Sequence, residues 1–294
     1  MDSNIDAKRE TTFFQIGGII ACSLALAVLF RPYFPKLLDI WISNPTYTHS
    51  PLIPFIVIYF IWDKRSLLRE IGAVPSYKGG LVALLISSIV WIVSVGGRSR
   101  FLVELSFIIL IISLVWVNFG IKIMRAISFP LLLLFMMIPL PEILYGRVSR
   151  SLQLLSSKYG VAFMQLFGVP VYREGNVIHL AQTTLQVAEA CSGISSLVSL
   201  FTLAMIYAYI SQKGLVRRLI IVLCAFPIAV FMNWVRIAAT GMIAHYWSLE
   251  YAQGFYHSFS GWIVFVTAFM IFMIIGSALS HLFDTHEVKG NKIL

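Results

Sequence analysis

The chain has 294 residues, of which 59% are hydrophobic and only 12% are Asp, Glu, Lys or Arg. Soluble domains carry about 25% charged residues, so this composition excludes a soluble enzyme, and it also excludes a disordered chain, which has the opposite bias. The formal net charge is +9, but the basic residues form short clusters between apolar runs, which is typical of membrane proteins rather than nucleic-acid-binding ones. Three cysteines without a CxxC pair predict neither a disulfide framework nor a zinc site.

The apolar segments predict an all-α polytopic membrane protein with about eight spans, since one span needs about 20 mostly apolar residues. In chain order these segments are 13–30, 51–62, 79–96, 101–119, 126–140, 193–210, 219–244 and 258–283. With the N-terminus in the cytoplasm, most lysines and arginines fall inside, so both termini are expected to be cytoplasmic. The first segment also resembles a secretory signal, but its apolar run continues to Phe30, which favours an uncleaved anchor.

The longest segment between the predicted spans is the outer loop 141–191. In residues 142–167 apolar positions alternate with basic ones, a period that predicts an amphipathic helix at the membrane interface. Residues 169–188 contain β-branched runs around Gly175-Asn176, which predicts a small β-hairpin. No internal repeat is visible, so residues 1–294 are expected to form one membrane domain.

Three ionisable or nucleophilic residues, Cys191, Arg236 and His257, fall at the outer ends of predicted spans. Ionisable groups at membrane depth are costly and therefore point to function. A thiolate at a helix N-terminus is stabilised by unpaired N–H groups, and a nearby guanidinium adds to this effect. A neutral imidazole takes or returns the thiol proton. Asn233, three residues before Arg236, shares its helix face and is expected to hold the guanidinium.

Each of these residues also has an ordinary interpretation. A cysteine in a membrane helix usually packs as a small apolar residue, and we interpret Cys22 and Cys224 in that way. An arginine near a span end often extends toward the headgroups. Other histidines predicted on the outer side remain alternatives to His257: His49, His179 and His245.

Several motifs resemble the exosortase/archaeosortase family of membrane proteins over roughly residues 40–275. The central block consists of Ile-Pro-Leu-Pro-Glu at 138–142, Gly-Val-Pro-Val-Tyr-Arg-Glu-Gly-Asn at 168–176 and Ala-Glu-Ala-Cys-Ser-Gly-Ile at 188–194. Downstream, Asn-Trp-Val-Arg-Ile at 233–237 and the stretch 257–261 resemble the family's second and third motifs, and upstream Tyr-Thr-His at 47–49 with 62–65 also fits. One departure is Ser195-Ser196 after the Cys motif, where Arg-Ser is more usual in the family.

The resemblance implies a Cys-Arg-His active site, as in bacterial exosortases, formed by Cys191, Arg236 and His257. It implies a membrane cysteine endopeptidase/transpeptidase that cleaves C-terminal sorting signals of exported proteins through a thioester. Such a signal comprises a short motif such as Pro-Glu-Pro, a transmembrane helix and a basic cluster. The expected location is the bacterial inner membrane, with the active site at the periplasmic face.

Five further residues are expected to support the site or bind substrate: Asn233, Glu189, Arg173, Ser192 and His49. Glu189 and Arg173 are equally compatible with an ion pair in the outer loop. We expect no metal, no organic cofactor and no nucleic acid. The expected partners are the exported substrate proteins and membrane lipids, and eight spans are compatible with a monomer.

Two other functions remain open on the sequence. In a transporter or channel, Arg236 and Glu104 would mark a polar pathway, although no inverted repeat is visible. In a membrane acyltransferase, Cys191 would carry a lipid thioester instead of a peptide one.

Overall fold

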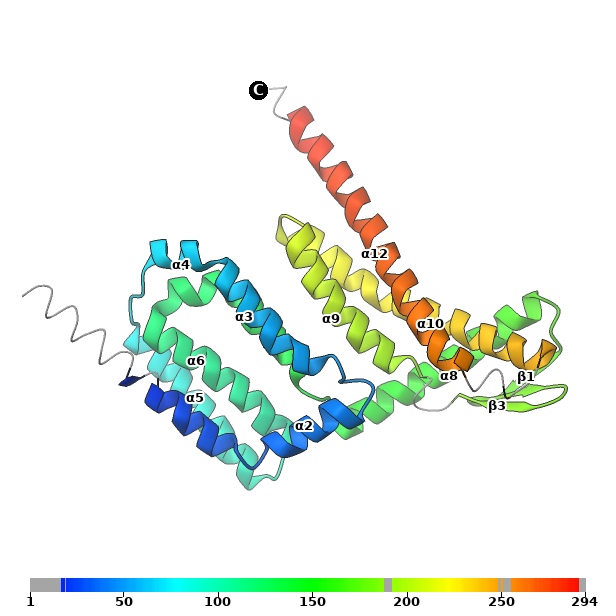
Figure 1. The fold of residues 1–294 in the computed structure, drawn as a ribbon, viewed down its shortest axis with the longest axis horizontal. Coiled ribbons are helices and arrows are strands. Elements are labelled where there is room, and N and C mark those ends of the chain that lie inside the picture. Colours follow the sequence, from blue (N-terminus) through cyan, green and yellow to red (C-terminus); the bar gives the residue numbers. More distant parts are fainter. Residues whose placement is uncertain (1–16, 19, 188–191, 248–249, 251–254, 291–294) are drawn as a thin grey trace, which may run out of the picture. The chain divides into compact units, whose positions relative to one another are not determined.

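The computed structural model describes the chain apart from residues 1–16, 19, 188–191, 248–249, 251–254 and 291–294 (Figure 1). Within the last helix, the side chains of residues 255–260 and 283–290 are likewise not described. The chain divides into two compact units, Met1–Leu140 and Pro141–Leu294. The single domain expected over residues 1–294 stays a prediction.

The secondary-structure elements in the described part of unit 1 are all helices, joined by short loops. A helix over Ile20–Phe30 is followed by α2 (Phe34–Ser43), η1 (Ser50–Leu52), α3 (Ile53–Asp63), α4 (Arg65–Ile71), α5 (Tyr77–Gly96), α6 (Arg100–Ala126), α7 (Ser128–Leu133) and η2 (Leu134–Met137).

Helices α5 and α6 form the closest helix pair of unit 1. A Cβ added at Gly80 would lie 2.8 Å from the backbone nitrogen of Val117, and one at Gly79 would lie 2.7 Å from the ring of Trp116. Small residues allow membrane helices to approach in this way, which raises dispersion contacts where no hydrophobic effect operates between helices. The pair therefore depends on these two glycines.

Helix α6 is broken at Gly120, where φ is +85°. The carbonyl oxygen of Val74 approaches Gly120 so closely that no Cβ would fit there. Two backbone amides of the same segment donate across the break, Val74 N to Phe119 O (3.4 Å) and Ser76 N to Val117 O (3.3 Å). The segment thus satisfies carbonyls that the interrupted helix leaves without a helical partner.

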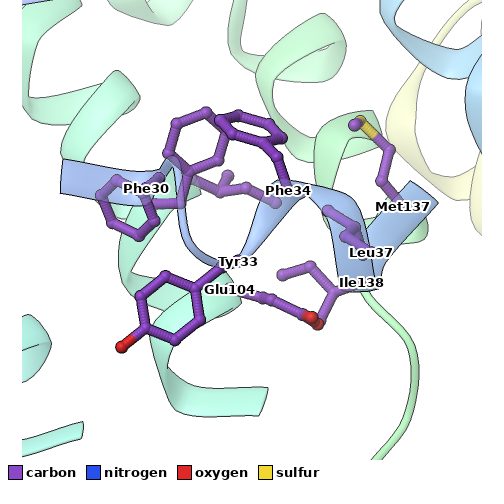
Figure 2. A pocket seen from close by; sticks show the side chains of 9 residues that line it. Phe30, Tyr33, Phe34, Leu37, Glu104, Met137 and Ile138 are labelled. Atoms are coloured by element: carbon purple, nitrogen blue, oxygen red, sulfur yellow. The ribbon is translucent and has the colours of Figure 1, made fainter. Parts of the chain in front are cut away.

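Near the start of α6, an apolar pocket contains one carboxylate, that of Glu104 (Figure 2). Phe30 and Phe34 line this pocket, and Glu104 is only 5% exposed. Arg100 Nε donates to Glu104 Oε1 at 2.8 Å, and the same guanidinium donates to the carbonyl of Lys36 at 3.0 Å. Glu104 therefore has a local partner one turn away, and its surroundings are apolar rather than a polar pathway.

Unit 2 contains α8 (Glu142–Leu166), β1 (Val171–Glu174), β2 (Val177–Leu180), β3 (Thr184–Gln186), α9 (Ile194–Ser211), α10 (Leu215–Tyr246) and α12 (Phe255–Gly290). The strands form an antiparallel sheet in the order β1-β2-β3. Glu174 pairs with Val177, so Gly175 and Asn176 form the two-residue turn, with Gly175 at φ +62°. The predicted hairpin is confirmed, whereas the third strand was not predicted.

Several, but not all, of the predicted spans are helices long and apolar enough to cross a membrane. Among the described residues five helices qualify, or up to seven if two bent helix pairs each count as one span. The five are Tyr77–Gly96, Arg100–Ala126, Ile194–Ser211, Leu215–Tyr246 and Gly261–Leu282. The predicted number of eight is not confirmed, and part of the first segment, 13–30, lies outside the described residues.

Two segments differ from their sequence prediction in detail. The span expected over 126–140 consists of the short pieces α7 and η2, because Pro139 and Pro141 end the helical run in extended backbone. The amphipathic helix expected over 142–167 is confirmed as α8, while its location at a membrane interface stays a prediction.

Candidate active site

Two of the three predicted catalytic residues, Arg236 and His257, belong to helices α10 and α12 of unit 2. These two helices and α9 pack against one another (Figure 1). These helices share one buried cluster rich in alanine, which includes Ala204, Ala225, Ala229, Ala268 and Phe272. Further along α12, a Cβ added at Gly276 would lie 2.5 Å from the hydroxyl of Tyr207 on α9. Such close packing fixes how the three helices are aligned along their lengths.

Arg236 lies about 32 Å along α10 from Leu215, at 1.5 Å per residue. This distance matches the roughly 30 Å hydrocarbon thickness of a bilayer. If α10 enters the membrane near its start, Arg236 therefore lies near the opposite boundary and not at mid-depth. The helix continues to Tyr246, where its last turns pack against α8 and the sheet.

The loop that follows Cys191 contacts α10 at Gly193 and Asn233. Gly193 is the residue before α9 and has φ +86°, and a Cβ there would lie 2.7 Å from Asn233 Cγ. Asn233 is 2% exposed, and its Nδ2 donates to Ser156 Oγ of α8 at 2.9 Å. Asn233 thus joins three segments: the residue two after Cys191, the helix that carries Arg236, and α8.

Arg236 contacts α12 at Gly261. A Cβ added at Gly261 would lie 3.9 Å from both Cζ and Nη2 of the guanidinium. His257 belongs to α12, one turn before Gly261, so the two positions share a helix face. The His257 side chain lies outside the described part, and its contact with Arg236 stays a prediction.

Of the other predicted site residues, Cys191 and Glu189 lie outside the described residues. Ser192 is buried, and its hydroxyl accepts a hydrogen bond from Ile194 N at 3.3 Å, which ties the loop to the first turn of α9. The contact expected between Asn233 and the Arg236 guanidinium stays a prediction. His49 belongs to unit 1, where burial lowers the pKa of its imidazole.

Arg173 helps to hold the hairpin on α8. Its Nη1 donates to Gly175 O at 2.8 Å and lies 3.4 Å from Ser157 Oγ, and the Ser157 hydroxyl itself donates to Gly175 O at 3.0 Å. Asn176 adds a bond to Val187 O at 3.1 Å. These bonds position the strand segment that leads toward Cys191, and a role of Arg173 in substrate binding stays a prediction.

The alternative histidines of unit 2 have local contacts away from Arg236. The His179 ring stacks on Tyr172 with centroids 4.5 Å apart, and its Nε2 lies 3.7 Å from a Glu174 oxygen. His245 lies nine residues beyond Arg236 on α10, about 14 Å along the axis. The helix contacts at Gly261 therefore favour His257 over these two.

Sequence reasoning missed Ser156 and Gly160, and it named Gly261 only as the end of the motif stretch 257–261. A Cβ at Gly160 would lie 2.8 Å from Ile237, so α8 approaches α10 directly beside the Asn233–Ser156 hydrogen bond. Ser156 and Gly160 form a small-xxx-small pair, a pattern that indicates close helix packing and was readable in the sequence. The motif stretch that includes Gly261 did not indicate its neighbour, and only the structure shows that this neighbour is Arg236. Among the described residues no group of three or more His, Cys, Asp or Glu side chains is arranged to hold a metal.

Comparison with known proteins identifies one family. Residues 41–274 match the family model described as transmembrane exosortase. No curated protein and no solved structure matches the chain.

Proposed function

The chain belongs to the transmembrane exosortase family, and on that premise we propose that it is a membrane cysteine endopeptidase/transpeptidase that uses Cys191 as its nucleophile. The family implies a multi-pass membrane protein with protein-sorting transpeptidase or protease activity. The finer assignment of residues, substrate and location is our proposal. We infer a location in the bacterial inner membrane, with both termini in the cytoplasm.

One observation carries the assignment: two contacts from different segments of unit 2 fall on the same stretch of α10. Gly193, two residues after Cys191, contacts Asn233, and the Arg236 guanidinium lies beside Gly261, one turn from His257. Asn233 and Arg236 are three residues apart on α10. The residues near Cys191 and His257 in the chain, Gly193 and Gly261, thus both contact the stretch of α10 that carries Arg236, and this supports the proposal that the thiol, guanidinium and imidazole share one site.

The proposed reaction begins with attack of the Cys191 thiolate on the scissile carbonyl of the substrate. Arg236 stabilises the oxyanion that develops, a contribution worth about 3–4 kcal/mol for a single donor in other enzymes. His257 accepts the thiol proton and returns it to the leaving amine, so the C–N bond breaks as the thioester forms. Water or an acceptor amine then attacks the thioester and restores the thiol.

The proposed substrates are exported proteins with a C-terminal sorting signal: a Pro-Glu-Pro-like motif, a transmembrane helix and a basic cluster. The helix of the signal would lie in the bilayer beside the enzyme and present the motif at the periplasmic boundary. This agrees with the position of Arg236, about one hydrocarbon thickness from the start of α10.

The decisive experiment replaces Cys191 by Ala and follows a reporter protein that ends in such a signal. We expect processing to stop while the membrane level of the enzyme stays unchanged, because the nucleophile is lost and the side chain changes by a single sulfur atom. The matched controls are Cys22→Ala and Cys224→Ala, which should process normally. Normal processing by Cys191→Ala would refute the proposal.

Mass spectrometry of the trapped intermediate separates the proposed activity from acyl transfer. A peptide adduct on Cys191 supports sorting, whereas a fatty-acyl adduct would show an acyltransferase. Transport receives no support from Glu104, since that carboxylate pairs with Arg100 in an apolar pocket.

A further inference from the structure

An open groove of about 750 Å³ runs along α3, α4 and α6 in unit 1. Its walls are apolar, and they include Ile58, Ile61, Leu68, Val115 and Phe119. Ile58 is 64% exposed and Trp62 58% exposed, so the groove opens onto the outer surface of this unit. A volume of this size lies within the range of small-molecule sites, about 300–1,000 Å³.

Two guanidinium groups, those of Arg65 and Arg69, also line the groove. They are four residues apart on α4 and therefore lie on the same side of that helix. In the part of the chain that the structure describes, neither forms an ion pair with a carboxylate. Like charges at this spacing repel each other, and an anion between them would remove the repulsion.

The Arg65 side chain is held in place beside the groove. Its guanidinium carbon lies 4.1 Å from the ring centroid of Trp62, and its Nη1 donates to Trp62 O at 3.2 Å. A tryptophan with an adjacent arginine at the end of an apolar helix is typical of the boundary between hydrocarbon and headgroups. The groove therefore has apolar walls and a cationic rim at one level.

The rest of this end of unit 1 is basic as well. Lys64 Nζ donates to Ala126 O at 2.5 Å, which joins the end of α3 to the end of α6. The antiparallel packing of α5 on α6 brings Lys78 to the same end as Lys122 and Arg125. The acidic residues on these turns are Asp63 and Glu70, so the local charge is positive.

We propose that the groove binds a diacyl phospholipid with an anionic headgroup. The phosphate lies between Arg65 and Arg69, and an acyl chain follows the apolar wall past Phe119 and Val115. Basic pockets between membrane helices recognise such headgroups. A soluble phosphate would leave the apolar walls unused, and an apolar peptide would leave the two guanidinium groups without a counter-charge.

Native mass spectrometry of the full chain with phosphatidylglycerol and phosphatidylcholine of identical acyl chains tests this proposal. The wild type should retain phosphatidylglycerol in preference to phosphatidylcholine. Arg65→Gln and Arg69→Gln should each lower that retention about fivefold, the ratio that corresponds to about 1 kcal/mol per basic residue. The matched control is Arg125→Gln, at the same end of unit 1 but outside the groove lining.

A second variant tests the apolar part of the site. Ala73 is exposed and lines the groove, so Ala73→Trp fills it without disturbing the core and should abolish lipid retention. Three results would overturn the proposal: equal retention of both lipids, an equal loss in Arg125→Gln and Arg69→Gln, or full retention by Ala73→Trp, which would show binding by the headgroup alone. The two arginines are exposed, so their variants decide the question even if Ala73→Trp does not fold.

Discussion

Replacing Gly193 by Ala should impair processing far more than the same change at Gly168, another glycine of unit 2 with a positive φ. Two costs add at this position. The backbone has φ +86°, a left-handed conformation that costs a residue with a Cβ about 1–2 kcal/mol. The new Cβ would also lie 2.7 Å from Asn233 Cγ and 3.1 Å from Asn233 Cβ, so the buried amide must move.

Movement of Asn233 breaks its 2.9 Å hydrogen bond to Ser156 inside the protein. A buried polar group left without its partner costs about 1–3 kcal/mol. The sum predicts a loss of about 2–5 kcal/mol in stability if the loop keeps its position. If the loop moves instead, Cys191 moves with it, and a displacement of about 1 Å at a catalytic group lowers the rate about 100-fold.

Gly168→Ala is the matched control. Gly168 has φ +76°, but a Cβ there would meet nothing within 4 Å, so this variant carries the backbone cost without the steric overlap. The assay combines thermal unfolding of the purified protein with processing of a reporter that carries a sorting signal. Equal effects of the two variants on both measurements would show that Asn233 does not restrain the loop after Cys191.

Two further predictions follow from the site and from unit 1. The Gly261→Ala variant should process the reporter normally, because its Cβ would be at an ordinary contact distance of 3.9 Å from the Arg236 guanidinium. The larger side chain of Gly261→Leu should displace that guanidinium and stop processing, with the protein level unchanged. Normal processing by Gly261→Leu would argue against the contact. Because burial holds the pKa of folded His49 below 6.5, the unfolded chain takes up the proton first as the pH falls, so His49 should make unit 1 less stable below about pH 6.5 and should have no such effect above it. Thermal unfolding at pH 7.5 and pH 5.5 should therefore show a smaller acid-induced decrease for His49→Gln than for the wild type, and an identical decrease would contradict this assignment.

The hydropathy of the sequence predicted the long helices well, because a run of about 20 apolar residues has few alternatives to a buried or spanning helix. The Gly-Asn pair at 175–176 also predicted the turn, because a two-residue hairpin turn needs a left-handed residue and glycine adopts that conformation readily. The sequence did not predict the break of α6 at Gly120. The break depends on the backbone at Val74 and Ser76, which lies more than forty residues earlier in the chain and bonds to α6 there. The short strand β3 escaped prediction because three residues carry almost no periodic signal.

The candidate site was predictable in its residue types and less so in its packing. The three-residue spacing of Asn233 and Arg236 indicated a common helix face, and α10 confirms one continuous helix there. The sequence did not indicate that Asn233 would bond to α8, because a hydrogen bond to Ser156 depends on how two helices distant in sequence pack. It suggested the guanidinium of Arg236 as the partner of Asn233 instead, a contact that stays a prediction.

The joint at the break in α6 consists of main-chain atoms alone. Val74 and Ser76 supply its two donors, and Pro75, which has no N–H to give, falls between them. Side chains at 74 and 76 are therefore free to diverge between relatives without loss of the joint, provided that neither becomes proline and that Gly120 is retained. An alignment would then show little at 74 and 76, and the invariant mark of this architecture would be a single glycine near the C-terminal end of a long apolar helix.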